Sequence, residues 1–267
     1  MFAITTRNKL RSRRFAVNML WAWRRIRRQL GRTRGMLAYT TGMASLTEFV
    51  TLSLWEKEID MFLFMSSEDH LDMMWNFRHW TDSFWSMRWN PTADEFGEWN
   101  NTIFACAAAG PARTPAYPGP GYLDSGEVSE QLKPLLRQIM RPEGPQTVEA
   151  HAVIGRIATP APAAVWRLKR ALSPWQAGPG MLRFSVAVGL GECMLVAIWQ
   201  RDGAEPARAL MTQVTKRFPS SWTMRFQATD FEVGHWDQLR LRDFGARGAA
   251  DGAETVIVPT RAQPSSG

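Results

Sequence analysis

The chain has 267 residues, of which 45% are apolar, and it carries a formal net charge of +7. This apolar content can fill one substantial core or two modest ones, and two cysteines are too few for a disulfide framework or a cysteine-based metal cluster. There is no apolar run of the roughly eighteen residues that a membrane helix needs and no apolar core of a secretory signal, so we expect a cytoplasmic protein without a membrane span.

The basic charge is concentrated near the N-terminus. Residues 7–34 hold Lys9 and ten arginines, and the first 47 residues contain no Asp or Glu. The other 21 basic and 25 acidic residues leave the rest of the chain slightly negative. We interpret the segment as a solvated helix face, which is the usual meaning of a charge run. A membrane surface or an anionic ligand stays open as its partner, and a nucleic acid is disfavoured.

The first hundred residues predict the order strand, helix, strand, strand, helix, strand. The first helix has apolar residues at helical spacing on one face and arginines elsewhere, and Gly31 and Gly35 follow its end. The predicted ranges are 2–10, 12–30, 36–43, 48–55, 56–80 and 84–89.

A second set of elements follows in the same order, with predicted ranges 148–158, 160–175, 181–188, 193–199, 205–218 and 222–227. Between the sets, residues 110–121 contain four prolines and three glycines, which is typical of a linker. We therefore divide the chain into a first repeat (1–105), a linker with an extra helix at 128–140 (106–145), a second repeat (146–244) and a flexible tail with a short strand at 256–259 (245–267).

The repetition is explicit in the sequence. Residues 84–99 return 137 positions later as residues 221–236, and seven of the sixteen positions are identical. An internal repeat is strong evidence about a fold, and a β-α-β-β-α-β unit is the ferredoxin-like motif. Since one such unit leaves a sheet face uncovered, we predict an α+β fold in which two tandem ferredoxin-like units close into an intramolecular barrel. The identical pairs are Trp85/Trp222, Met87/Met224, Arg88/Arg225, Thr92/Thr229, Glu95/Glu232, Gly97/Gly234 and Trp99/Trp236.

Residues retained in both copies favour structural roles, since a site in one half would not need both. We predict an Arg–Glu pair within each repeat, Arg88 with Glu95 and Arg225 with Glu232, that braces the last strand against the segment after it. Trp99 and Trp236 are predicted to fill the core or an interface.

The strand ending in Leu-Ser-Leu-Trp55, followed by a helix with Ser67-Glu68-Asp69-His70, resembles the dimeric α+β barrel superfamily. The resemblance is strongest to antibiotic-biosynthesis-monooxygenase-like domains, and it covers most of residues 1–100 and, more weakly, 146–244. The superfamily includes cofactor-independent monooxygenases and heme-degrading oxygenases. The resemblance thus implies the barrel fold and an oxidoreductase activity.

Three features resemble the heme-degrading members in particular: Asn8 on the first strand, Gly35-Met36-Leu37 opening the second, and Trp55 ending the third. The axial histidine of those enzymes aligns with Met74, whereas His70 lies four residues earlier on the same helix face. The resemblance therefore implies a heme site only with His70 as a displaced ligand.

His70 is the most interesting titratable residue. It lies on an apolar helix face, where an imidazole can ligate heme iron or act as a base. The alternative is a histidine at the edge of the core that is hydrogen-bonded to a backbone carbonyl. The other members of this face are Ile59, Phe62, Leu63, Ser66, Met73, Met74 and Phe77.

The sequence thus predicts a monooxygenase-like oxidoreductase that acts on an apolar or aromatic small molecule in the first repeat. In the heme-dependent version, His70 is the axial ligand and the N-terminal arginines pair with the propionates. In the cofactor-independent version, Asn8 or His70 orients the substrate. A non-catalytic small-molecule or heme-binding protein is the alternative, and the substrate, reaction and oligomeric state stay open. The predicted site residues are Asn8, Trp55, Phe62, His70 and Met74.

Overall fold

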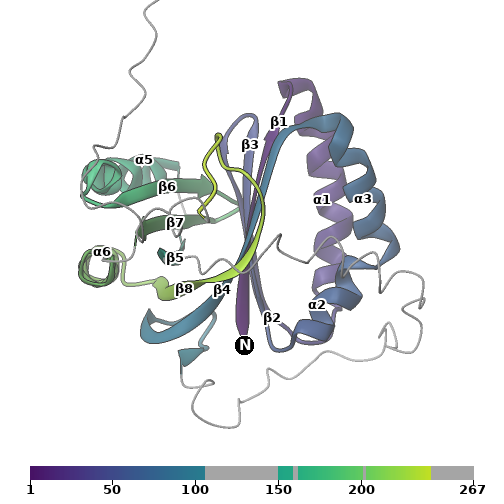
Figure 1. Cartoon of the computed structure of the whole chain (residues 1–267). Coiled ribbons are helices and arrows are strands. Elements are labelled where there is room, and N and C mark those ends of the chain that lie inside the picture. The colour runs from purple at the N-terminus through teal and green to yellow at the C-terminus, as the bar shows by residue number, and fades with distance from the viewer. Residues whose placement is uncertain (106–149, 159–161, 201–202, 242–267) are drawn as a thin grey trace, which may run out of the picture.

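The computed structural model describes residues 1–105, 150–158, 162–200 and 203–241. Within these ranges, eight strands form one closed barrel in the order β1-β3-β2-β6-β7-β5-β8-β4. The architecture is the α+β barrel that the sequence predicts, with both ferredoxin-like units in one chain (Figure 1). The predicted linker with its helix (106–145) and the predicted tail with its strand (245–267) lie outside the described residues.

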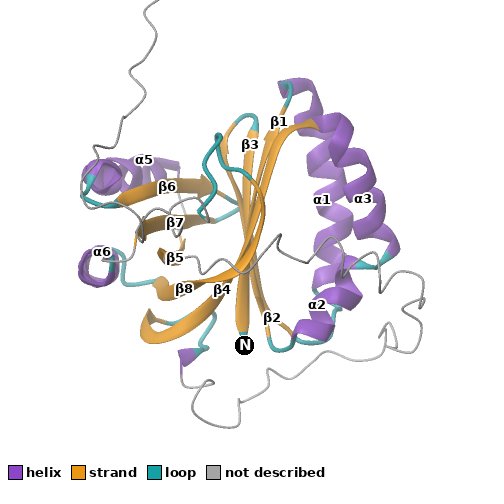
Figure 2. Cartoon of the chain, viewed as in Figure 1, coloured by secondary structure: helices purple, strands orange, loops and turns teal. Residues whose placement is uncertain are grey.

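The first unit has the predicted β-α-β-β-α-β order, with its second helix in two parts. Three helices cover the outer face of its four strands (Figure 2). The elements are β1 (Phe2–Leu10), a 3₁₀ turn (Arg13–Phe15), α1 (Ala16–Leu30), β2 (Met36–Ser45), β3 (Glu48–Trp55), α2 (Glu58–Met65), α3 (Glu68–Trp80) and β4 (Thr81–Gly97).

The single long helix predicted over 56–80 is wrong, because two serines interrupt it. Ser66 Oγ donates to the carbonyl of Leu63 at 3.0 Å, and Ser67 Oγ donates to that of Phe64 at 2.6 Å. Ser67 itself is extended, with φ −70° and ψ 152°, and it precedes the first residue of α3. Serine hydroxyls compete in this way with the helical hydrogen bonds of the backbone. A helical wheel drawn through residues 59–77 therefore does not describe one continuous face.

The second unit repeats the order on the opposite side of the barrel, where α5 and α6 cover its strands (Figure 1). Its elements are β5 (Ala150–Ala158), α5 (Pro162–Leu172), a 3₁₀ turn (Ser173–Ala177), β6 (Met181–Val188), β7 (Glu192–Gln200), α6 (Ala204–Arg217) and β8 (Ser221–Gly234).

The two seams between the units differ. The long strands β4 and β8 pair over most of their length, and the pairs Trp85↔Gly234 and Gly97↔Trp222 are related by the sequence repeat. In contrast, β2 and β6 share the single pair Met43↔Val188. Tryptophans of both units fill the barrel interior, and Trp99 and Trp236 are each 4% exposed, which confirms their predicted place in the core.

The predicted Arg–Glu pairs within each repeat are wrong. Glu95 accepts hydrogen bonds from the indole of Trp222 and from the backbone amides of Phe104 and Ala105. Arg225 donates to Asp94 at 2.5 Å instead of to Glu232. The reason is that β4 and β8 lie side by side, so carboxylates on one strand reach partners on the other. The retained side chains therefore join the two units to each other.

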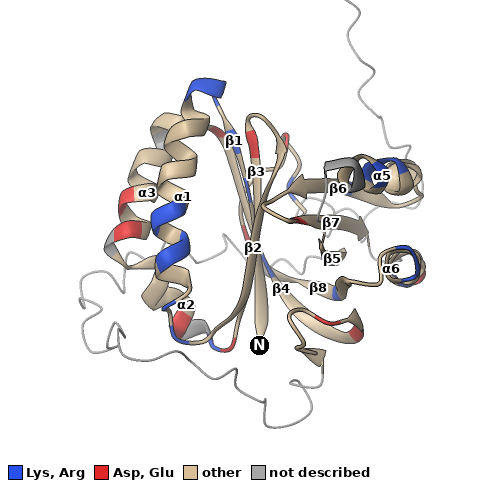
Figure 3. Cartoon of the chain, turned by 180° about the vertical axis from the view of Figure 1, so that it is seen from behind, with Lys and Arg blue, Asp and Glu red and all other residues tan. Residues whose placement is uncertain are grey.

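The arginines of the basic segment that lie on α1 are exposed, as predicted, whereas Arg7 on β1 is buried and only 1% exposed. Arg24, Arg25, Arg27 and Arg28 are exposed, while Met19, Ala22, Ile26 and Leu30 are buried against the sheet. Figure 3 shows basic residues on α1 and acidic residues on the neighbouring α3, and Arg25 contacts Asp72 at 2.5 Å between these helices. None of the helices in the described ranges combines the length and the hydropathy required to cross a membrane.

Candidate functional site

A cavity of about 140 Å³ lies between the sheet of the first unit and its helices. We call it the helix-side cavity. All four strands of the first unit contribute to it, and Phe231 of β8 adds one side chain from the second unit. Its walls are mainly apolar and include Ile4, Met19, Ile26, Phe49, Leu52, Met61, Phe64, Met73, Phe77 and Phe84.

The floor of this cavity is polar, although it lies under three helices. Alternate residues of a strand share one face, and the face of the first unit that turns toward the helices carries an amide and several hydroxyl groups. Most of the hydroxyls have partners: those of Thr6 and Thr51 bond to each other, and Thr41 donates to the carbonyl of Val50 at 3.1 Å. The polar residues are Thr6, Asn8, Thr41, Thr51, Ser53 and Ser86.

Asn8 differs from these hydroxyls because its amide has no partner. Its side chain is 4% exposed, its Oδ1 is buried, and neither amide atom is hydrogen-bonded within the described part of the chain. A buried polar group without a hydrogen bond costs about 1–3 kcal/mol. An amide retained at that cost beside a cavity is a candidate for contact with a ligand.

The second unit lacks such a floor. Trp55 pairs with Phe2, and Trp199 pairs with His151, so the strands of the two units can be aligned from these pairs. On that alignment, Asn8 corresponds to Ile157, which is fully buried. Apolar residues or glycine also replace the hydroxyl residues of three strands: Gly155 for Thr6, Val186 for Thr41, Leu195 for Thr51 and Ala197 for Ser53. The polar set is therefore a property of the first unit.

His70 lies at the start of α3 and lines the helix-side cavity. Its Nδ1 lies 3.1 Å from the carbonyl oxygen of Met65, and its ring packs edge-on against Phe64 at 4.8 Å. Burial lowers the pKa of His70 from 6.5 to about 4, so the imidazole is neutral at pH 7. Since a carbonyl can only accept, Nδ1 carries the hydrogen and Nε2 keeps its lone pair.

Four of the five predicted site residues line this one cavity: Asn8, Trp55, His70 and Met74. Phe62 is not among its lining residues, and Phe64 contributes from α2 instead, 5.6 Å from the ring of Trp55. The sequence reasoning missed the hydroxyl floor, as well as Trp23 and Tyr39. The signal was available, because the polar residues recur at alternate positions of strands that helices must cover.

The residues present do not fit a heme. The helix-side cavity of about 140 Å³ is well below the roughly 300–1,000 Å³ of sites for drug-sized ligands, so it suits a molecule of one or two rings and not a porphyrin. Among its described lining residues there is no Lys or Arg to pair with propionates, so none of the predicted arginine partners reaches it. Within the described ranges, no three His, Cys, Asp or Glu side chains gather into a metal site either.

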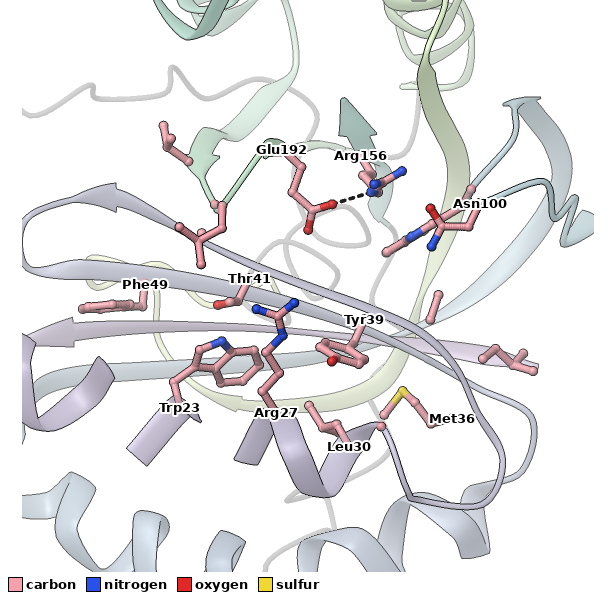
Figure 4. Close-up of a pocket in the computed structure, with 18 of the residues that line it drawn as sticks. Trp23, Arg27, Leu30, Met36, Tyr39, Thr41, Phe49, Asn100, Arg156 and Glu192 are labelled. Carbon is pink, nitrogen blue, oxygen red and sulfur yellow. Dashed lines mark hydrogen bonds and ion pairs between the residues drawn. The ribbon is translucent and has the colours of Figure 1, made fainter. Parts of the chain in front are cut away.

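Figure 4 shows a second cavity, of about 790 Å³, which shares lining residues with the first one. It lies at the seam between β2 and β6, and we call it the seam cavity. Gly42 allows the close approach of the strands there, since a Cβ on it would lie 2.7 Å from the carbonyl carbon of Ala187. Polar residues of both units line the cavity, among them Arg27, Asn100, Arg156 and Glu192. Five residues line both cavities: Trp23, Leu30, Tyr39, Thr41 and Phe49.

No protein-family model matches the chain, and no curated protein matches it. Solved structures do resemble it. A candidate monooxygenase of Fusobacterium nucleatum is 9% identical with a TM-score of 0.34, over 86% of this chain and 93% of that one. Another, of Lactobacillus acidophilus, is 8% identical with a TM-score of 0.34, over 87% and 95% of the two chains.

SnoaB of Streptomyces nogalater, a cofactor-independent oxygenase, is 11% identical with a TM-score of 0.27, over 33% of this chain and 86% of that one. At these values the resemblance carries no argument about activity. The fold assignment rests on the strand order and the two repeated units of the chain itself.

Proposed function

We propose that the first unit binds an apolar or aromatic small molecule in the helix-side cavity and oxidises it with O₂, as a cofactor-independent monooxygenase. The single observation that carries this proposal is that the unpartnered amide of Asn8 and the neutral imidazole of His70 line the same cavity. The second unit, with Ile157 in place of Asn8, supports the barrel.

The chemistry needs a substrate that supplies its own electrons. An aromatic hydroxyl compound does so, because loss of the hydroxyl proton delocalises negative charge onto a ring carbon that O₂ can attack. For 1-naphthol, the balanced reaction is C₁₀H₈O + O₂ → C₁₀H₆O₂ + H₂O. One oxygen atom enters the ring as a carbonyl of 1,4-naphthoquinone, and the other leaves as water.

The two polar residues have complementary tasks in this reaction. Nε2 of His70 accepts the hydrogen bond of the substrate hydroxyl and takes its proton. The Nδ2–H of Asn8 donates to the same oxygen as it becomes negative, and a donor in a dry site stabilises such an oxyanion strongly. The apolar walls hold the ring and exclude water from the charged intermediate.

The test is oxygen uptake with 1-naphthol as the probe, together with formation of 1,4-naphthoquinone that carries one ¹⁸O atom from ¹⁸O₂. We expect turnover by the purified protein and a loss of about a hundredfold or more in His70→Asn and Asn8→Leu. His79→Gln, an exposed histidine on the same helix, is the matched control and should keep full activity.

Two results would favour the alternatives. Binding of 1-naphthol without oxygen uptake would favour a non-catalytic binding protein. A Soret band on addition of hemin that is lost in His70→Ala would favour the heme-dependent version, in spite of the poor fit of the cavity.

A further inference from the structure

The two units contain equivalent arginine–glutamate pairs that the sequence comparison missed. Arg7 and Glu48 in the first unit correspond to Arg156 and Glu192 in the second, as the strand pairing shows. In each pair the arginine Nε donates to the carboxylate. Each guanidinium also lies over a repeated tryptophan of the other unit, Arg7 at 5.7 Å from Trp236 and Arg156 at 5.8 Å from Trp99.

Of these two arginines, only Arg7 has a hydrogen-bond acceptor for each nitrogen of its guanidinium. Arg7 is 1% exposed; its Nη1 donates to Ser83 at 3.0 Å and its Nη2 to Asp237 at 2.8 Å. At the position equivalent to Asp237, the second pair has Asn100. Both residues follow the repeated tryptophan and have left-handed backbones, with φ of 48° and 51°.

Arg156 therefore keeps unused hydrogen-bond donors. Among the described residues, its guanidinium bonds to Glu192 alone, and neither Nη1 nor Nη2 has an acceptor. Arg156, Glu192 and Asn100 all line the seam cavity. Arg156 therefore has one carboxylate partner where Arg7 has two, because Asn100 stands in the place of Asp237.

A second guanidinium enters the seam cavity from α1. Arg27 rises between Trp23 and Tyr39, and it points toward the side on which Glu192 and Arg156 lie (Figure 4). In the described part of the chain, Arg27 has no ion pair. The neighbouring Arg25 on the same helix contrasts with it, since Arg25 is paired with Asp72.

The surroundings of Arg27 reinforce the positive charge. A groove that adjoins the cavity is lined by Arg24, Arg27, Arg28, Arg32 and Tyr39. No carboxylate in the described ranges pairs with any of these arginines. Like charges held together repel one another, and a bound anion would relieve that repulsion.

We propose that the seam cavity binds the carboxylate of an aromatic carboxylic acid, held between Arg27 and Arg156. Two guanidinium groups and one carboxylate leave one net positive charge, which matches one carboxylate, and the planar donors of arginine suit that group. The five shared lining residues place the helix-side cavity next to the rings of such an acid. The proposal that the seam cavity binds this acid does not depend on the proposed oxidation. Only the identification of the acid as the substrate rests on the function proposed above.

The experiment is calorimetric titration with 2-naphthoate, with 2-naphthamide as the neutral probe of the same shape. We expect the wild type to bind the naphthoate, more weakly at high salt, and to bind the naphthamide at least about tenfold more weakly. Arg27→Gln should weaken naphthoate binding about tenfold, while leaving naphthamide binding unchanged. The matched control is Arg25→Gln, which removes a charge from the same helix and should bind as the wild type does.

Asn100→Asp is the second variant, and it removes no arginine. The new carboxylate at position 100 is the counterpart of Asp237, which accepts a hydrogen bond from Arg7. It should pair with Arg156, and the variant should therefore bind naphthoate about tenfold more weakly while it stays fully folded. Three results would overturn the proposal: no binding of naphthoate, equal binding of naphthoate and naphthamide, or equal effects of Arg27→Gln and Arg25→Gln. Because no turnover is measured, a failed oxidation assay leaves this outcome unaffected.

Discussion

The indole nitrogen of Trp85 lies 2.8 Å from Oε1 of Glu232, a residue of the other unit 147 positions later in the chain. Both side chains are buried, at 1% and 3% exposure. The repeat supplies the reciprocal bond, in which the indole of Trp222 donates to Glu95. The retained tryptophans and glutamates thus hold the long seam of the barrel from both sides.

We expect Trp85→Phe to lower the free energy of unfolding by about 1.5–3 kcal/mol, because a buried carboxylate loses a hydrogen-bond donor. Trp222→Phe should have a similar effect, because both glutamates keep backbone amide donors, Glu95 from Phe104 and Ala105 and Glu232 from Leu241. Urea denaturation measures both. The control is Trp166→Phe at a site that is 63% exposed, where a change within about 0.5 kcal/mol is expected. Equal stability of Trp85→Phe and Trp166→Phe would contradict this role.

The hydrogen bonds between the two units could not be predicted from the sequence, although several strands could. Strands 2–10, 48–55 and 181–188 were predicted with the bounds that the structure has, because apolar runs, glycines and the repeat itself mark their ends. The partners of Glu95 and Glu232 depend on which strands meet at the seam, and residues near one another in the sequence do not reveal that. The same limit hid the pairing of Arg7 with Asp237.

The candidate site likewise contains residues that the sequence predicted and features that depend on the tertiary structure. The family resemblance predicted Asn8, Trp55 and Met74 and the helix pattern predicted His70, and all four line one cavity. Phe62 was predicted from a helical wheel, but Ser66 and Ser67 end one helix and begin another, and Phe62 does not line the cavity. The hydrogen bond of His70 to a backbone carbonyl, which the sequence left open as an alternative, is present. Because Nε2 of His70 keeps its lone pair, the imidazole can still accept the proton of the substrate hydroxyl in the proposed reaction.

The glycines of the repeated segment should be essential for the long seam. Gly97 and Gly234 both have φ of +75°, and a Cβ on either would lie 2.0 Å from a carbonyl oxygen of the neighbouring strand. We expect Gly97→Ala and Gly234→Ala to cost more than about 2 kcal/mol of unfolding free energy, since strain and a backbone clash combine.

Gly180→Ala separates these two effects. Gly180 has φ of +68°, but a Cβ there would have no neighbour within 4 Å. Its substitution should cost only the strain of about 1–2 kcal/mol. If thermal denaturation showed the same loss of stability for all three variants, a backbone clash at the seam would not contribute to the cost.

His70 should make the stability of the protein depend on pH. The unfolded chain binds a proton at His70 near pH 6.5 and the folded protein only near pH 4, so the unfolded state binds more protons between these values. Stability is therefore lost as the pH falls from about 6.5 to 4, by up to about 3 kcal/mol in total.

Urea midpoints measured between pH 4 and pH 7.5 test this dependence. His70→Gln does not titrate and should give a flatter profile than the wild type below pH 6.5. His79→Gln, which changes an exposed histidine of the same helix, should keep the slope of the wild type. If both variants lost the slope equally, or neither did, His70 would not be the group responsible.

Asn8→Leu should stabilise the protein while lowering its proposed activity about a hundredfold or more. Asn8 is buried without a hydrogen bond, and its counterpart in the second unit is the apolar Ile157, so leucine should relieve the cost of the unpaired amide and raise the free energy of unfolding by about 1–2 kcal/mol. The reciprocal change, Ile157→Asn, buries a polar group in the core of the second unit and should cost about 3 kcal/mol. Urea denaturation and the 1-naphthol assay, run on the same preparations, measure both properties. A less stable Asn8→Leu would mean that the amide has a structural partner, and it would remove the main support for a ligand at this position.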